Sequence, residues 1–293
     1  MTGNMPADRR IAVVTGAAGG LGQATAQRLL AAGLDVVAVT RDARGAEATR
    51  RSLQDRAGGG VVHALHADLL RRDDVDALGE RLRGTVPRVD VLINNAGAAF
   101  PDYATTADGA ERTHALNHLA PFRLTHLLLA SGLFAADARI IAVSSDLVSR
   151  ARLDTGDPDV TGTGWHDRFS QLTVYGTAKL IGLLATAALA ARLPAGMRVH
   201  SANPGVLRTG FHAKAGGPLK AIAAVGGLFA ASPEKAAHGP VLLATAATPP
   251  VPSGGLLVKG RPATPPAVTR DAALTTEVYE RTARALGIAP ISA

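Results

Sequence analysis

The sequence predicts an α/β fold built on a doubly wound parallel sheet. Apolar runs of strand length alternate with amphipathic segments of helix length along most of the 293 residues. Strands that are apolar on both faces are typical of a parallel sheet with helices packed on both sides. No break in composition divides the chain, so we expect a single domain over 10–293, preceded by a disordered tail over 1–9.

Each expected element follows from its pattern of apolar residues. Strands are expected at 10–15, 34–40, 61–67, 89–93, 139–144, 198–202 and 256–259. Helices are expected at 21–32, 44–56, 74–83, 115–131 and 174–193. Two stretches interrupt this alternation: an irregular insertion over 146–173 and a Gly- and Ala-rich apolar lid over 210–231. We interpret 248–252 and 262–266 as loops.

The composition excludes several classes of protein. Hydrophobic residues make up 47% of the chain, which permits a large core, and the absence of Cys excludes disulfides and thiolate metal sites. The formal net charge is +7, but the arginines are dispersed and aromatics are only 3%, so no nucleic-acid partner is expected. The start has no signal-peptide pattern and no apolar run reaches membrane-spanning length, so we expect a cytoplasmic protein without a membrane span.

A glycine-rich loop follows the first strand and leads into the first helix. It reads Thr15-Gly-Ala-Ala-Gly-Gly-Leu-Gly22, with the spacing Gly-x-x-x-Gly-x-Gly. Glycines at this position allow a tight turn and a close approach to a pyrophosphate, whose charge lies at the helix N-terminus. The loop therefore predicts a dinucleotide site.

Further motifs follow in a fixed order. Asn94-Asn-Ala-Gly97 follows the fourth strand, Asn117 opens a long helix, Ser144-Ser145 ends the fifth strand, and Tyr175-Gly-Thr-Ala-Lys179 lies at the start of the helix expected from 174. Pro204-Gly205 follows the sixth strand, with Thr209 beyond it. Over residues 10–209 this set resembles the short-chain dehydrogenase/reductase family, which implies a Rossmann-type fold.

The resemblance implies a catalytic set. Tyr175 is the expected general acid/base, Ser145 the hydrogen-bond donor to the substrate oxygen, and Asn117 the support of a water-linked proton relay. Lys179, one helical turn after Tyr175, is expected to hold the nicotinamide ribose and to lower the pKa of the tyrosine. Ser144 is the competing serine, but the second serine of such a pair is the usual one.

The resemblance also implies a cofactor site. Asp68 is expected to hydrogen-bond the adenine ring. The full expected set is Gly16, Ala18, Gly19, Gly20, Leu21, Gly22, Arg41, Asp68, Leu69, Asn95, Ala96, Gly97, Tyr175, Lys179, Pro204, Gly205, Val206 and Thr209.

The end of the second strand indicates which cofactor is used. An acidic residue there favours NAD, whereas Arg41 is the first charged side chain in this chain. A guanidinium can bind a 2′-phosphate through two hydrogen bonds, with Thr40 adding a hydroxyl, so we expect NADP(H). Asp42 leaves an alternative open, because a one-residue shift of the turn would place its carboxylate on the ribose.

The spacing of 30 residues between Ser145 and Tyr175 is longer than in most of the family and resembles the retinol-dehydrogenase-like branch. The insertion is expected over the mouth of the active site, with Trp165, His166 and Phe169 as substrate contacts; the alternative is a surface loop unrelated to substrate. The resemblance implies a homodimer or homotetramer, since the Tyr-bearing helix is a usual subunit interface in the family.

The histidines do not predict a metal site. His114 and His118 are spaced i, i+4, but no third ligand is evident, and a packed or surface pair is favoured. The same interpretation applies to His63 and His66.

The leading hypothesis is an NADP(H)-dependent carbonyl reductase or alcohol dehydrogenase that acts on a mostly apolar small molecule. The alternatives are a hydroxysteroid- or retinoid-like dehydrogenase working oxidatively, and a non-catalytic protein that senses NADP.

Overall fold

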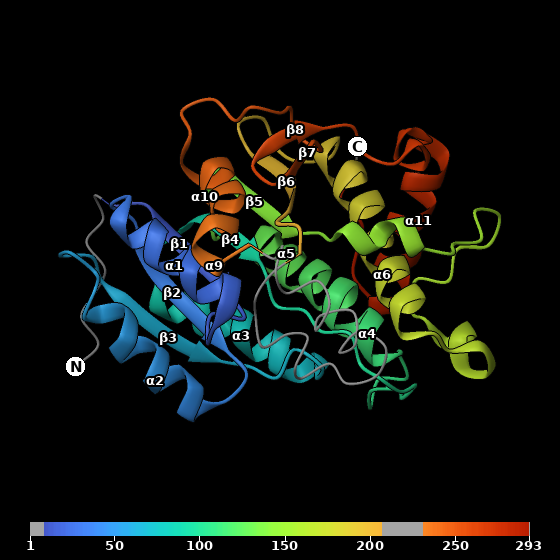
Figure 1. The fold of residues 1–293 in the computed structure, drawn as a ribbon, viewed down its shortest axis with the longest axis horizontal. Coiled ribbons are helices and arrows are strands. Elements are labelled where there is room, and N and C mark those ends of the chain that lie inside the picture. The colour runs from blue at the N-terminus through green and yellow to red at the C-terminus, as the bar shows by residue number, and fades with distance from the viewer. Residues whose placement is uncertain (1–8, 207–230, 293) are drawn as a thin grey trace.

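The fold is organised around one eight-stranded sheet, seen in a computed structural model that describes residues 9–206 and 231–292. The strand order is β3-β2-β1-β4-β5-β6-β7-β8, and every neighbouring pair is parallel except β7 and β8 (Figure 1). The strands are β1 Ile11–Thr15, β2 Asp35–Thr40, β3 Val62–His66, β4 Val89–Asn94, β5 Phe134–Val143, β6 Arg198–Asn203, β7 Leu256–Val258 and β8 Arg261–Ala263.

Helices cover both faces of the sheet. The longer ones are α1 Gly20–Ala31, α2 Ala43–Gln54, α3 Arg72–Thr85, α5 Ala120–Ala130, α6 Gln171–Ala190, α10 His238–Thr245 and α11 Ala272–Leu286. The shorter helical segments are α4 Arg112–His114, η1 Ala115–Leu119, η2 Asp146–Arg150, η3 Thr163–Arg168, α9 Pro233–Ala236 and η4 Ala267–Arg270.

Two hydrophobic cores result, one on each face of the sheet. Strand β1 shows how: Ile11 and Val13 belong to the core under α3, α5, α6 and α11, while Ala12 and Val14 belong to the core under α1, α2 and α10. This alternation follows from the two-residue period of a strand. All four side chains are completely buried, as a parallel sheet covered on both faces requires.

Helix α6 is central to this architecture. Among the described residues it alone is long and apolar enough, by length and composition, to cross a membrane. However, 78% of the apolar 18-residue stretch of this helix is buried inside the structure, as is typical of a core helix. Figure 1 shows α6 beside α11 on one side of the sheet.

The doubly wound parallel sheet is confirmed, and the expected strands lie within one or two residues of the observed ones except for β5, which begins at Phe134. Two expectations were wrong. Strand β8 overlaps the predicted loop over 262–266 and is antiparallel to β7, and the helix expected over 115–131 begins with a π-helical turn. Helices α10 and α11 were not predicted. Residues 1–8 of the expected tail over 1–9, and 210–230 of the expected lid over 210–231, lie outside the described residues.

Candidate active site

In the glycine-rich loop between β1 and α1, the backbone at Gly16 lies directly against the first turn of α1 at Gly22. Gly16 has a φ of 68°, and a Cβ at Gly22 would lie 2.3 Å from the Gly16 oxygen, so neither position has room for a larger residue. The side-chain amide of Asn95 donates to the Thr15 oxygen at 2.8 Å and so ties the loop to β4. The N-terminus of α1 at Gly20 is thereby fixed beside the loop, which is the arrangement that fits a pyrophosphate.

The predicted cofactor residues gather at one edge of the sheet. They follow the carboxyl ends of β1, β2, β3, β4 and β6, where the ligands of open α/β sheets bind. Asp68 accepts from the backbone N–H of Leu70 at 3.1 Å, and Gly205, with a φ of 78°, donates its N–H to Asn203 Oδ1 at 2.9 Å. Thr209 lies outside the described residues.

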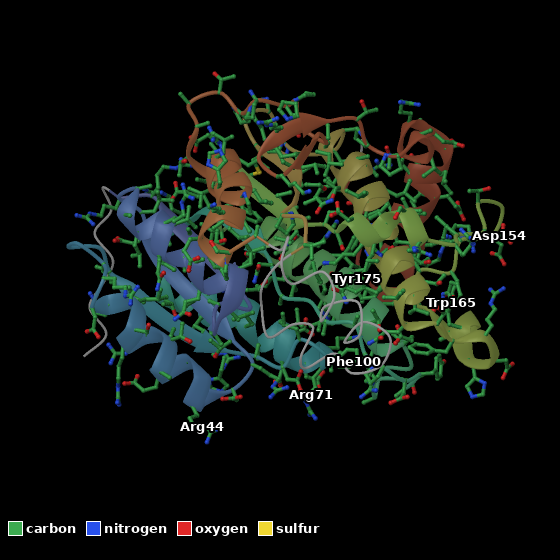
Figure 2. All side chains as sticks on the ribbon, in the orientation of Figure 1. Arg44, Arg71, Phe100, Asp154, Trp165 and Tyr175 are labelled. Carbon is green, nitrogen blue, oxygen red and sulfur yellow. The ribbon has the colours of Figure 1, made fainter. Side chains whose placement is uncertain are left out.

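The turn between β2 and α2 gives Arg41 and Asp42 different surroundings. Asp42 is the N-cap of α2, and its Oδ1 accepts from the backbone N–H of Gly45 at 2.8 Å. Thr40 Oγ1 donates to the Asp42 carbonyl at 3.0 Å and closes the turn. Arg41 is exposed, and Arg44, also exposed, points away from the protein at the start of α2 (Figure 2).

The proposed catalytic pair, Ser145 and Tyr175, is brought together by a close contact between η2 and α6. The two side chains are hydrogen-bonded to each other, and Ser145 Oγ also accepts from the backbone N–H of Leu147 at 3.2 Å. A Cβ at Gly176 would lie 2.2 Å from the Leu147 oxygen, so only glycine allows η2 this close to α6. Lys179 Nζ donates to the Val143 oxygen at 2.8 Å, directly before the two serines.

Asn117 lies in the π-helical turn η1, and such turns are frequent at functional sites. Its Nδ2 donates to the oxygens of Ala98 at 2.7 Å and Thr113 at 2.8 Å. Its Oδ1 is buried and has no hydrogen-bond partner among the described residues. A Cβ at Gly97 would lie 2.5 Å from this oxygen and 3.4 Å from Lys179 Nζ, so Asn117 Oδ1 and the ammonium face the same small space.

The protonation of this site differs from the sequence-based expectation. Burial raises the pKa of Tyr175 to about 12, although the hydrogen bond with Ser145 acts to lower it. Burial also lowers the pKa of Lys179 to about 8. The prediction that Lys179 lowers the tyrosine pKa is therefore wrong for this chain without a ligand: desolvation dominates, and the ammonium lies 5.7 Å from the centre of the Tyr175 ring.

The insertion packs against α6 and α11, with Leu153 and Val160 in a small apolar cluster. Trp165 is buried under the guanidinium of Arg168, whereas His166 is exposed and stacks edge-on against Tyr103. Phe169 is half-buried. In Figure 2, Trp165 lies nearer the periphery than Tyr175. A substrate contact by these three residues stays a prediction.

His114 and His118 are both buried and packed. The Nδ1 of His114 is 3.3 Å from the Val160 oxygen, and the Nε2 of His118 is 2.8 Å from Thr282 Oγ1. His63 and His66 lie on β3. Within 9–206 and 231–292, no group of three or more His, Cys, Asp or Glu side chains is arranged to hold a metal ion.

Three residues of the site were not found from the sequence. Gly176 allows the contact between η2 and α6, and its signal was the small residue within Tyr-Gly-Thr-Ala-Lys. Asn203 donates from Nδ2 to Asp146 Oδ1 at 2.7 Å and so joins the serine loop to the loop after β6. Glu111 is completely buried at the start of the helix that carries Asn117.

Comparison with known proteins gives a consistent result. A sequence model of the family described as short chain dehydrogenase matches residues 10–152. A Streptomyces sp. (strain C5) protein, provisionally named daunorubicin C-13 ketoreductase DnrU, is 34% identical over 281 residues, which cover 95% of this chain and 93% of the relative. Human retinol dehydrogenase 13 is 33% identical over 80% of this chain and 71% of its own.

Solved structures agree with the sequence comparison. An uncharacterized protein from Mycobacterium paratuberculosis superposes with a TM-score of 0.74 at 27% identity, covering 100% of this chain and 99% of the other. A short-chain dehydrogenase from Sphingobium yanoikuyae, solved in complex with NADPH, has a TM-score of 0.62 at 28% identity, covering 79% and 82%.

Proposed function

Because the chain belongs to the short-chain dehydrogenase/reductase family, on its retinol-dehydrogenase-like branch, we propose that it is an NADP(H)-dependent carbonyl reductase acting on a mostly apolar small molecule. The observation that carries this proposal is the contact between Ser145 and Tyr175, with Lys179 one turn further along the same buried helix. A protein that binds the cofactor without catalysing a reaction has no chemical need for this arrangement.

In the proposed mechanism the protein holds the substrate oxygen and supplies a proton. The hydride would come from NADPH when it is bound. Ser145 and Tyr175 both donate hydrogen bonds to the carbonyl oxygen, and the Tyr175 hydroxyl gives up its proton as the alcohol forms. Lys179 Nζ and the Asn117 amide oxygen both lie beside Gly97, and a water molecule bound by the two groups would return a proton to the tyrosine.

The similarity to DnrU supports the reductive direction, because DnrU aligns over nearly the whole chain and is named a ketoreductase. Reduction of a carbonyl consumes a proton from the acid, whereas oxidation of an alcohol needs the phenolate as base. Burial raises the pKa of Tyr175 to about 12, which favours the proton-donating form over the phenolate.

The choice of NADP(H) rests on the turn after β2. The Asp42 carboxylate is the N-cap of α2, and its Oδ1 already accepts from the backbone N–H of Gly45, which favours Arg41 as the side chain that contacts the ribose end of the cofactor. Arg41 and Arg44, both exposed, flank the N-cap Asp42 in the sequence, and a 2′-phosphate bound near this N-terminus would gain from the helix dipole and from their charges. Two structural neighbours at 28% identity, the Sphingobium yanoikuyae short-chain dehydrogenase and a blue fluorescent protein from a metagenomic library, were solved in complex with NADPH.

The test is turnover of NADPH over a panel of apolar ketones and aldehydes by the wild type and by Tyr175→Phe. The substitution removes one hydroxyl and keeps the ring, so we expect kcat to fall at least about 100-fold with the Kd for NADPH unchanged. Tyr279→Phe is the matched control, because Tyr279 is a buried tyrosine of α11 bonded to His126, and its loss should leave kcat within about twofold. Near-normal turnover by Tyr175→Phe contradicts the mechanism.

A second candidate is oxidation of a hydroxysteroid- or retinoid-like alcohol, which the similarity to retinol dehydrogenase 13 favours. Measuring both directions on each alcohol/carbonyl pair separates the two. If NADPH binds but no pair is converted in either direction, the alternative of a protein that senses NADP is favoured instead.

A further inference from the structure

The start of the helix that carries Asn117 holds a carboxylate with an unusual environment. Glu111 is 0% exposed and, among the described residues, forms no ion pair. Its Oε1 accepts from Thr113 Oγ1 at 2.9 Å and its Oε2 accepts from the backbone N–H of His114 at 2.9 Å. Both oxygens of this buried carboxyl group are therefore satisfied by hydrogen bonds, as a buried polar group requires.

The two hydrogen bonds fix the segment from which Asn117 is oriented. Thr113, held by Glu111 through its hydroxyl, presents its backbone oxygen to Asn117 Nδ2 at 2.8 Å. With Ala98 as the second acceptor, both amide hydrogens of Asn117 are used, and this leaves Oδ1 as the only group that can face Gly97 and Lys179. A displacement of Thr113 would free the amide to rotate.

The insertion is attached to the same carboxylate-bearing residue. The backbone N–H of Glu111 donates to the Thr161 oxygen at 2.9 Å, and the His114 ring lies against the insertion at Val160. Gly162, with a φ of 76°, passes so close that a Cβ there would lie 2.6 Å from the His114 ring. The insertion is therefore docked on the first turn of this helix.

We propose that Glu111 is a positioning residue for Asn117. Its backbone N–H holds the insertion at Thr161, while its carboxylate fixes Thr113 and so orients the Asn117 amide towards Lys179. This role rests on the proposed function, since Asn117 matters there as part of the proton relay. The insertion thereby supports the catalytic helix, in addition to any contact that it makes with substrate.

The decisive experiment is a double-mutant cycle on kcat between Glu111→Gln and Asn117→Ala. If Glu111 acts through Asn117, Glu111→Gln lowers kcat at least about tenfold in the wild type but less than about twofold in the Asn117→Ala background, while the Kd for NADPH stays unchanged. Thr282→Val is the control: it removes the hydrogen bond to His118, the neighbour of Asn117, and its effect on kcat should be small and the same in both backgrounds.

Two results overturn the proposal: no change in kcat for Glu111→Gln, or an equal loss in both backgrounds. Should Glu111→Gln fail to fold, Thr113→Val removes one of the two hydrogen bonds and enters the same cycle.

A readout that needs no turnover keeps this inference separate from the proposed function. In NMR spectra of the wild type we expect the Asn117 side-chain amide protons to exchange slowly with water, and at least about tenfold faster in Glu111→Gln but not in Thr282→Val. Equal exchange in the wild type and Glu111→Gln overturns the positioning role, even if no substrate of the enzyme has been found.

Discussion

Lys179 carries its charge inside the protein, and this has a cost that can be measured. Burial lowers the pKa of Lys179 from 10.5 to about 8. Since one pKa unit corresponds to about 1.4 kcal/mol, the charged ammonium destabilises the folded chain at pH 7 by about 3 kcal/mol relative to an exposed lysine. The only described acceptor for Nζ is the Val143 oxygen, which does not neutralise the charge.

The sign of the pH dependence follows from the direction of the pKa change. Between pH 8 and 10.5 the folded chain binds fewer protons at Lys179 than the unfolded chain does, so the cost is complete below pH 8 and disappears as the pH rises past 10.5. Replacing Lys179 with Met removes the charge. We therefore expect the change in free energy of unfolding caused by Lys179→Met to be more favourable at pH 7 than at pH 10, by about 2–3 kcal/mol.

The measurement is urea unfolding of the wild type and Lys179→Met at pH 7 and pH 10. Loss of the hydrogen bond to Val143 costs about 1 kcal/mol at both pH values. The test is therefore the difference between the changes in free energy of unfolding at pH 7 and pH 10, because this cost cancels in that difference. Lys235→Met, at an exposed lysine, should show no such difference. The same change in stability at both pH values for Lys179→Met would refute the reasoning.

Two further predictions concern cofactor choice and the contact below the catalytic tyrosine. The wild type should prefer NADPH over NADH by at least about tenfold in kcat/KM, about 1.4 kcal/mol, and Arg41→Ala should bring the ratio close to one; an unchanged ratio would show that Arg41 does not contact the phosphate. Gly176→Ala should lower kcat by about tenfold and reduce the Tm, because its Cβ would push the Leu147 oxygen, and Ser145 with it, away from Tyr175. Gly182→Ala on the same helix, where a Cβ meets nothing within 4 Å, should instead stabilise the chain by up to about 1 kcal/mol and leave kcat unchanged.

Much of the fold and the site could be predicted because the relevant signals are local. Apolar strands and glycine-rich turns identify the parallel sheet, and its topology brings the motifs after β1, β4, β5 and β6 to one edge. The sequence also contained a local signal for the role of Asp42 as a helix cap, since Asp is a preferred N-cap and α2 begins at the next residue. Helix α11 was marked in the same way by Asp271 at its N-cap and Gly287, with a φ of 64°, at its end.

The remaining features depend on contacts between distant residues. Strand β8 contains Pro262, which argues against a central strand but is tolerated at the edge of a sheet. The π-helical turn at Asn117 forms where the asparagine side chain binds Thr113 and Ala98, and no periodicity in 115–131 reveals it. The pKa of Tyr175 follows from its burial, which the spacing from Lys179 could not show.

The burial of α6 connects the stability of this protein with its chemistry. The helix has an almost uninterrupted apolar surface, and Tyr175 and Lys179 are placed in it near the end that contacts η2. The same low-polarity surroundings keep the phenol protonated and make the ammonium costly. A partner that hydrogen-bonds the ammonium, such as a ribose hydroxyl, would recover part of this cost only when it is bound. The site therefore contributes least to the stability of the folded chain in the absence of a ligand, and this is the state in which the urea experiment measures it.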